Sequence, residues 1–83
     1  MAYMTVNFKC GTKTHNFHAK QDEHNHTKSN EFSKAAKALM KKMYPQAADG
    51  DIEQGSYKSN QSSFSSPSNE LVWRGSSWVQ GKA

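Results

Sequence analysis

Four histidines and a single cysteine are the residues of this 83-residue chain that could supply nitrogen or sulfur ligands to a metal ion, with Asp22 or Glu23 near the second histidine pair. His15 and His18 lie three residues apart, and His24 and His26 lie two apart. Zinc takes imidazole and thiolate ligands in tetrahedral sets. On a strand, however, His15 and His18 point to opposite faces, and no CxxC or HExxH spacing supports either pair. We interpret His24 and His26 as part of a solvated polar loop and expect no metal ion or cofactor, with chelation by these two side chains as the alternative.

Hydrolytic catalysis needs a nucleophile beside a base and an orienting acid, and the sequence offers no such set. The serines are numerous, but none lies in a glycine elbow. Paired carboxylates occur only as Asp22-Glu23 and as Asp49, Asp51 and Glu53, in stretches typical of solvated loops. The five glycines are scattered and form no phosphate-binding loop. We therefore expect a protein that is not an enzyme.

Lysines dominate the charge of the chain, which has a net charge of +4. The excess lies in residues 1–48, which hold eight lysines against three acidic residues. Lys34, Lys37 and Lys41 recur at helical spacing and could contact phosphates or acidic side chains, although a solvated helix face is the simpler alternative. The only arginine is Arg74, which argues against sequence-specific base reading, since that favours bidentate arginine contacts.

A second candidate surface is the serine-rich stretch at residues 56–68, which contains seven serines and two aromatic residues. Tryptophan, tyrosine and arginine are typical anchors of protein interfaces, and polar strands often find partners through their edges. The predicted anchors are Tyr57, Phe64, Arg74 and Trp78, although one tryptophan is expected in the core. Tyr3, Tyr57, Phe64 or Trp78 could alternatively stack nucleobases if exposed.

The clearest element that could position these residues is a helix at residues 30–44. Its predicted apolar face consists of Phe32, Ala35, Ala36, Leu39, Met40 and Met43. Asn30 or the preceding serine can cap its start, Lys41 and Lys42 suit its C-terminal end, and Pro45 stops it. The lysine side of the helix is expected to face solvent.

Alternating residues predict a hairpin at residues 3–20 that turns at Gly11, and further strands at 52–58, 70–74 and 77–80. The last two ranges could equally form a single strand with a glycine bulge at Gly75. The expected fold is a single α+β domain over residues 1–83. It has an antiparallel sheet of three to five strands, in the order strand-strand-helix-strand-strand, with one amphipathic helix on one face. The residues expected to pack together are Phe32, Leu39 and Met43 of the helix, and Val6, Phe8, Phe17, Val72 and one tryptophan of the sheet.

Composition limits the class of protein. Hydrophobic residues make up 34% of the chain and the mean hydropathy is −0.98, so the core is thin and self-association would add burial. The lone Cys10 excludes an intramolecular disulfide and favours a reducing compartment. The sequence has no apolar run long enough to span a membrane and no signal-peptide pattern after its initial Met, so we expect a complete cytoplasmic product.

The leading hypothesis is a non-catalytic interaction protein that binds and blocks a larger macromolecule, namely an acidic protein surface or a nucleic-acid-handling complex. Lys34, Lys37 and Lys41 would steer the encounter and the four anchors would hold the partner. Short chains without catalytic residues are typical of phage-encoded accessory or inhibitor proteins. The alternative is direct, sequence-tolerant nucleic-acid binding through the same lysines, and a small metal-dependent protein is a third possibility.

Overall fold

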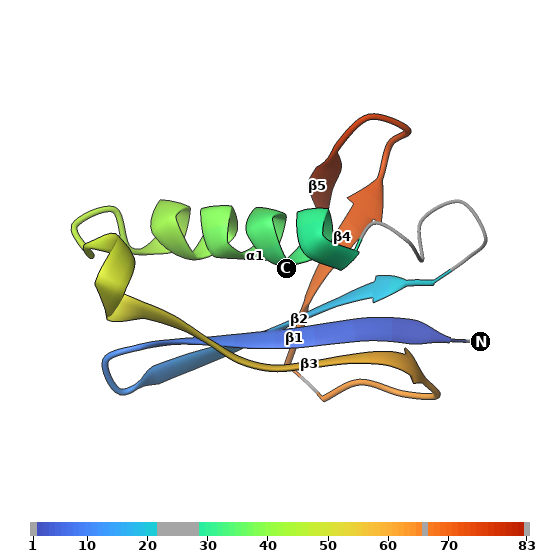
Figure 1. Ribbon diagram of the computed structural model, residues 1–83, viewed down its shortest axis with the longest axis horizontal. Helices are drawn as coiled ribbons and strands as arrows, with labels where there is room; N and C mark the ends of the chain where they lie inside the picture. Colours follow the sequence, from blue (N-terminus) through green and yellow to red (C-terminus); the bar gives the residue numbers. More distant parts are fainter. Residues whose placement is uncertain (1, 22–28, 66, 83) are drawn as a thin grey trace.

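Five strands and one long helix form the fold in the computed structural model, which describes residues 2–21, 29–65 and 67–82 (Figure 1). The elements are β1 (Tyr3–Cys10), β2 (Lys13–Lys20), α1 (Ser29–Met43), the short 3-10 helix η1 (Asp49–Asp51), β3 (Ile52–Gln61), β4 (Asn69–Trp73) and β5 (Trp78–Lys82). The predicted α+β class is confirmed, as is a sheet of up to five strands. Three strands follow the helix instead of the two in the predicted order, and the helix is shifted by one residue from its predicted bounds.

The strands form one sheet in the order β3-β1-β2-β4-β5. Three neighbouring pairs are antiparallel, as predicted, but β2 and β4 are parallel and pair over only two positions, Phe17 with Asn69 and His18 with Glu70. Strands β2 and β3 are both antiparallel to β1, and β4 is parallel to β2, so β3 and β4 run in the same direction and the chain runs back along the sheet between them. Because β3 and β4 lie on opposite sides of the β1–β2 hairpin, the chain crosses the sheet before it forms β4, and residues 62–65 and 67–68 are here called the crossing segment.

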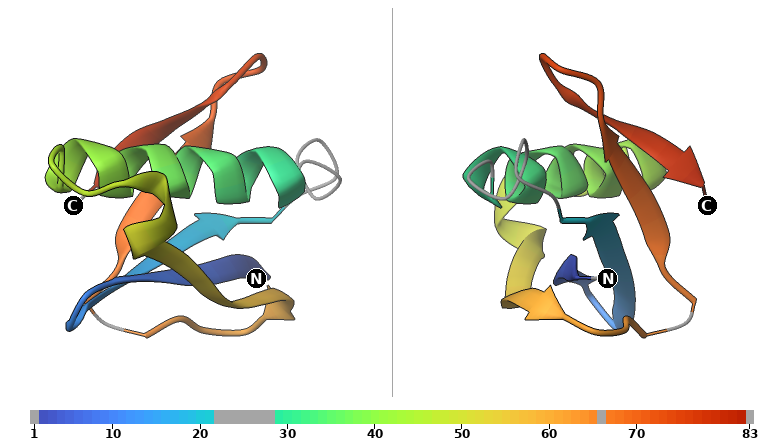
Figure 2. Two further views of the ribbon diagram at one scale, coloured as in Figure 1. Left: turned by 60° about the vertical axis from the view of Figure 1, so that its left-hand side comes forward. Right: turned by 90° about the vertical axis from the view of Figure 1, so that its right-hand side faces the viewer.

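Helix α1 covers one face of the sheet, and the crossing segment lies on the opposite face, here called the outer face (Figures 1 and 2). Strands β4 and β5 rise beside the helix, so the sheet curls around it (Figure 2). The alternation of β1 and β2 sends every second side chain toward α1. The core consists of Met4, Val6, Phe8, Phe17, Ala19, Phe32, Ala36, Met40, Ile52, Leu71 and Trp78.

The prediction of which α1 side chains pack against the sheet is confirmed along the helix as far as Met40 and is wrong at its C-terminal end. Phe32, Ala36 and Met40 are fully buried at a spacing of four, whereas Leu39 is half-buried. Met43 is the last residue of α1 and is 41% exposed, so the apolar face ends at Met40. On β4, Leu71 is buried in the core in place of the predicted valine. Within the described residues, no helix is long and apolar enough to cross a membrane.

Candidate interaction surfaces

The predicted partner-binding residues are not brought together into one site. They lie at the side of α1 (Lys34, Lys37, Lys41), on β3 facing the helix (Tyr57), on the outer face (Phe64), at the β4–β5 turn (Arg74) and in the core (Trp78). The structure therefore distributes the residues of the two predicted surfaces over separate regions, of which two have the form of a groove.

The first groove runs between α1 and β3 and has a volume of about 320 Å³. We call this region the α1–β3 border, and its lining residues are Phe8, Asn30, Ser33, Lys34, Lys37 and Gln54. Lys34 is exposed and Lys37 is half-buried, and neither forms an ion pair with another described residue. Because β3 is the last strand on its side of the sheet, its outer edge has no neighbouring strand among the described residues.

Lys41 and Tyr57 lie near this border but are partly used by the fold. The Lys41 ammonium donates a hydrogen bond to the carbonyl oxygen of Ala47 at 2.7 Å and lies 3.5 Å from the Asp49 carboxylate. It therefore ties the loop after α1 back to the helix. Tyr57 is half-buried, and its ring centroid lies 6.4 Å from that of Phe32. Of the three predicted lysines, Lys34 and Lys37 are the two available to a partner.

The outer face carries a cluster of three aromatic rings. The Phe64 ring of the crossing segment lies parallel to the His18 ring, with a centroid distance of 3.6 Å and an interplanar angle of 5°. Tyr3 meets both rings edge-on, at 5.0 Å from Phe64 and 6.2 Å from His18. The His18 Nδ1 atom also forms a 2.8 Å hydrogen bond with the hydroxyl of Ser68. These contacts fasten the crossing segment to β2.

Burial lowers the pKa of His18 below its ordinary value of 6.5, and the carboxylate of Glu70 partly opposes this effect. The imidazole is therefore held mainly in its neutral form.

His18 and Ser68 also form a base-and-hydroxyl pair that the sequence did not reveal, since 50 residues separate them. Such a pair needs an oxyanion site as well before it can act as a nucleophile. The expectation that the chain is not an enzyme stays a prediction.

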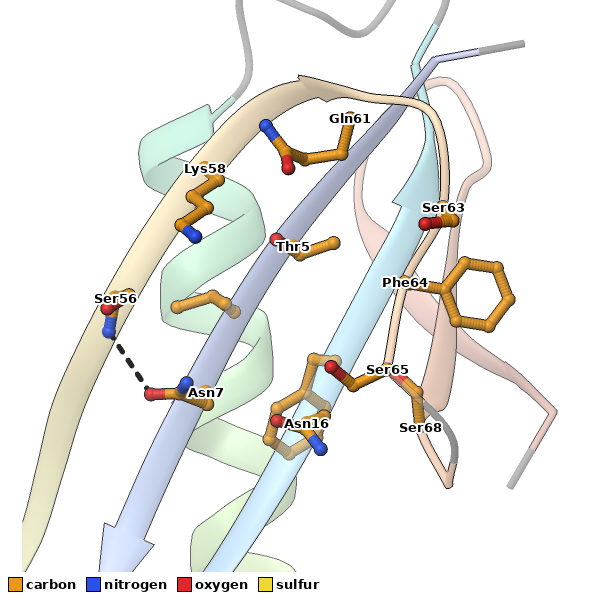
Figure 3. Close-up of a pocket in the computed structure, with 12 residues that line it drawn as sticks. Thr5, Asn7, Asn16, Ser56, Lys58, Gln61, Ser63, Phe64, Ser65 and Ser68 are labelled. Carbon is orange, nitrogen blue, oxygen red and sulfur yellow. Dashed lines mark hydrogen bonds between the residues drawn. The ribbon is translucent and has the colours of Figure 1, made fainter.

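The second groove lies on the outer face between β3 and the crossing segment and has a volume of about 370 Å³ (Figure 3). Its polar lining consists of Thr5, Asn7, Asn16, Ser56, Lys58, Gln61, Ser63, Ser65 and Ser68. The Asn7 carboxamide oxygen accepts a hydrogen bond from the backbone N–H of Ser56 at 3.1 Å. Among the described residues that line this groove, Lys58 is the only charged one, and none is acidic.

The structure corrects the predicted role of Trp78 as an exposed anchor. Trp78 is only 8% exposed, and its ring centroid lies 5.4 Å from that of Phe32 and 5.5 Å from that of Trp73. It is the core tryptophan that the sequence led us to expect. Its indole N–H has no hydrogen-bond partner among the described residues. Arg74 is exposed at the β4–β5 turn, and neither groove includes it.

The two described histidines point to opposite faces of β2, as the strand spacing predicted. The His15 Nε2 atom forms a 2.7 Å hydrogen bond with the Tyr44 hydroxyl on the helix side, whereas His18 faces the outer side. They therefore cannot bind one ion together. No group of three potential metal ligands occurs within residues 2–21, 29–65 and 67–82. His24 and His26, the other candidate ligands, lie outside the described residues.

A scan against protein-family models finds no match, and searches of curated proteins and of solved structures find none either. The α1–β3 border offers two lysines beside an open strand edge, and the outer groove offers neutral polar groups with one lysine.

Proposed function

We propose that this protein is a non-catalytic interaction protein that binds an acidic surface of a partner protein through the α1–β3 border. The observation that carries the proposal is the position of Lys34 and Lys37 in a groove beside the open edge of β3. An edge strand offers unpaired backbone N–H and C=O groups to an extended segment of a partner. The two lysines supply long-range attraction and select acidic side chains on that segment.

In this proposal an extended, acidic segment of the partner adds to β3 as a further strand. Side chains on one face of the added strand point toward α1, where Lys34 and Lys37 contact them, since successive side chains alternate between faces. Most residues of β3 are exposed and polar, which leaves this strand accessible. The protein then acts by occupying the partner's surface, and the predicted target is a nucleic-acid-handling complex.

The proposal is tested with two double variants that carry the same total charge. Lys34→Glu with Lys37→Glu alters the border, and Lys13→Glu with Arg74→Glu alters exposed cations at the turns of the two hairpins. Each pair changes the net charge from +4 to 0, because each reversal removes two units. The probe is a fluorescent decapeptide of alternating glutamate and threonine, and its anisotropy is measured at low salt.

We expect the border variant to lose about tenfold or more in affinity for the peptide, and the turn variant to change by less than about threefold. A peptide with proline at alternate positions should bind more weakly, because proline cannot donate to a strand pair. Equal losses in both variants would show that total charge alone acts and would overturn the assignment to the border.

The same variants separate the nucleic-acid alternative. Labelled single-stranded and duplex oligonucleotides are titrated over a range of salt concentrations. Tight oligonucleotide binding that falls steeply with salt and is lost in the Lys34→Glu, Lys37→Glu variant would make the border a nucleic-acid surface. That result, together with no binding of the acidic peptide, would overturn the proposal of a protein partner.

A further inference from the structure

We propose that the outer groove binds a phosphorylated ligand through a single phosphoryl group, which Lys58 and Asn7 hold. The groove lies on the opposite face of the sheet from α1, so it is a separate site from the α1–β3 border. Its volume of about 370 Å³ falls within the range of small-molecule sites, which begins at about 300 Å³.

The charge of the lining favours an anion. Lys58 lines the groove, forms no ion pair with another described residue, and meets no carboxylate in the lining. A lysine ammonium in such a position acts as a point charge for phosphate. Lys58 and Gln61 of β3 line the groove together with Thr5 of β1, and Figure 3 shows the three side chains near one another.

The fold fixes the direction of the Asn7 amide. Its oxygen accepts the hydrogen bond from the Ser56 N–H, so its NH₂ group must point elsewhere and is left to donate. Gly55 stands beside this oxygen, because a Cβ at that position would lie only 1.8 Å from it. The β-bulge opposite Asn7 therefore leaves space for the Asn7 side chain at Gly55 and fixes the orientation of its amide through the Ser56 N–H.

Hydroxyl groups complete the donor set around the same space. Thr5 and Ser56 line the groove from neighbouring strands, and Ser63 and Ser65 line it from the crossing segment. Phosphate oxygens accept hydrogen bonds from ammonium, amide and hydroxyl donors alike. The Phe64 ring points away from these side chains in Figure 3, so the lining supplies polar contacts and no stacking surface for a flat ring.

The phosphoryl group could belong to a free small molecule, such as a nucleoside monophosphate, or to the backbone of a single-stranded nucleic acid. One lysine and a few neutral donors give weak binding to inorganic phosphate, so we expect a dissociation constant in the millimolar range. A larger ligand gains further contacts with the rest of the groove and should bind more tightly.

The test uses the isotope-labelled full chain and follows the Asn7 side-chain NH₂ signals and the backbone amides of Ser56 and Lys58 by NMR. Sodium phosphate is titrated against sodium chloride at matched ionic strength, and a nucleoside monophosphate and a short single-stranded oligonucleotide are then titrated. Saturable shifts at these positions that chloride does not produce are the expected result. Tighter binding of the mononucleotide indicates a small-molecule ligand, whereas tighter binding of the oligonucleotide indicates a nucleic-acid backbone.

Two variants and a control make the assignment specific. Asn7→Asp keeps the oxygen that accepts from Ser56 but replaces the donating NH₂ group with a charged acceptor, so it should abolish phosphate binding without loss of the fold. Lys58→Gln should also abolish binding, and the matched change Lys13→Gln at the far turn should leave it unchanged. Unchanged binding in Asn7→Asp, absence of saturable shifts, or no gain in affinity for either phosphorylated ligand would overturn the proposal.

Discussion

Replacement of Gly55 by alanine tests how β3 fits against β1. Gly55 lies at the β-bulge opposite Asn7, and it does not adopt a positive φ, so its backbone can accept an alanine. The obstacle is the Asn7 side chain, because the new Cβ would lie 1.8 Å from its oxygen and 3.0 Å from its Cγ. The nearest backbone atom, the Asn7 carbonyl oxygen, would be 3.5 Å away, which is an ordinary contact. Only the carboxamide therefore needs to move.

The cost of that movement can be worked from its parts. Asn7 loses its hydrogen bond with the Ser56 N–H, worth about 0.5–1.5 kcal/mol, and leaves its rotamer at a cost of about 0.5–1.5 kcal/mol. Alanine restores about 0.4–1 kcal/mol by restricting the unfolded chain. We expect Gly55→Ala to lower the free energy of unfolding by about 1 kcal/mol.

In the Asn7→Ala background the obstacle is absent, and the same Gly55→Ala change should stabilise the protein by about 0.4–1 kcal/mol. The coupling free energy of the cycle is then about 2 kcal/mol. It is measured by urea unfolding of the four proteins, followed by tryptophan fluorescence, to which Trp73 and the buried Trp78 both contribute. Equal destabilisation in both backgrounds would refute the reasoning, since the backbone itself would then require glycine.

Two further predictions concern the histidines. Because burial lowers the pKa of His18, the unfolded chain binds a proton more readily than the folded chain. The stabilisation that neutral His18 provides should therefore be fully present above its ordinary pKa of 6.5. It should be lost as the pH falls from 6.5 toward the lower pKa that His18 has in the folded protein. Urea unfolding over this range should show a smaller acid loss in His18→Phe than in the wild type, and equal losses would contradict the prediction. Tyr44→Phe removes the hydrogen bond to His15 and should lower the free energy of unfolding by about 1 kcal/mol. The control Tyr3→Phe should lower the free energy of unfolding by less, because the Tyr3 hydroxyl forms no hydrogen bond with another described residue. An equal decrease in the two variants would show that the Tyr44–His15 hydrogen bond is not the cause.

The hairpin and the helix could be predicted because their signals are local. Every second residue of 3–10 is apolar, and each of these faces the helix side in the structure. The helix stretch repeats its apolar residues at the helical period and ends before a proline. In both cases neighbouring residues decide the element, so one sequence is sufficient.

The arrangement of the sheet depends on contacts that the sequence does not display. Nothing in the sequence of the crossing segment indicates that it lies on the outer face, because the contact of Phe64 with His18 joins residues far apart in the chain. The choice between Trp73 and Trp78 for the core also depends on which face of β5 meets Phe32. The sequence analysis named Lys34 and Lys37 of the α1–β3 border, because their helical spacing is a local signal. It named neither Asn7 nor Lys58 of the outer groove, because these two residues are brought together only by the pairing of β1 with β3.

The position of β3 at the edge of the sheet explains both candidate surfaces. Its side chains alternate between the two faces, so Gln54 and Tyr57 face α1, while Ser56 and Lys58 face the outer groove. The bulge at Gly55 separates the two sets and orients Asn7. A partner strand that paired with the edge of β3 would lie in the plane of the sheet and would leave the outer groove open. The proposed protein partner and the proposed phosphorylated ligand can thus be bound at the same time, and β3 is the element through which one would affect the other.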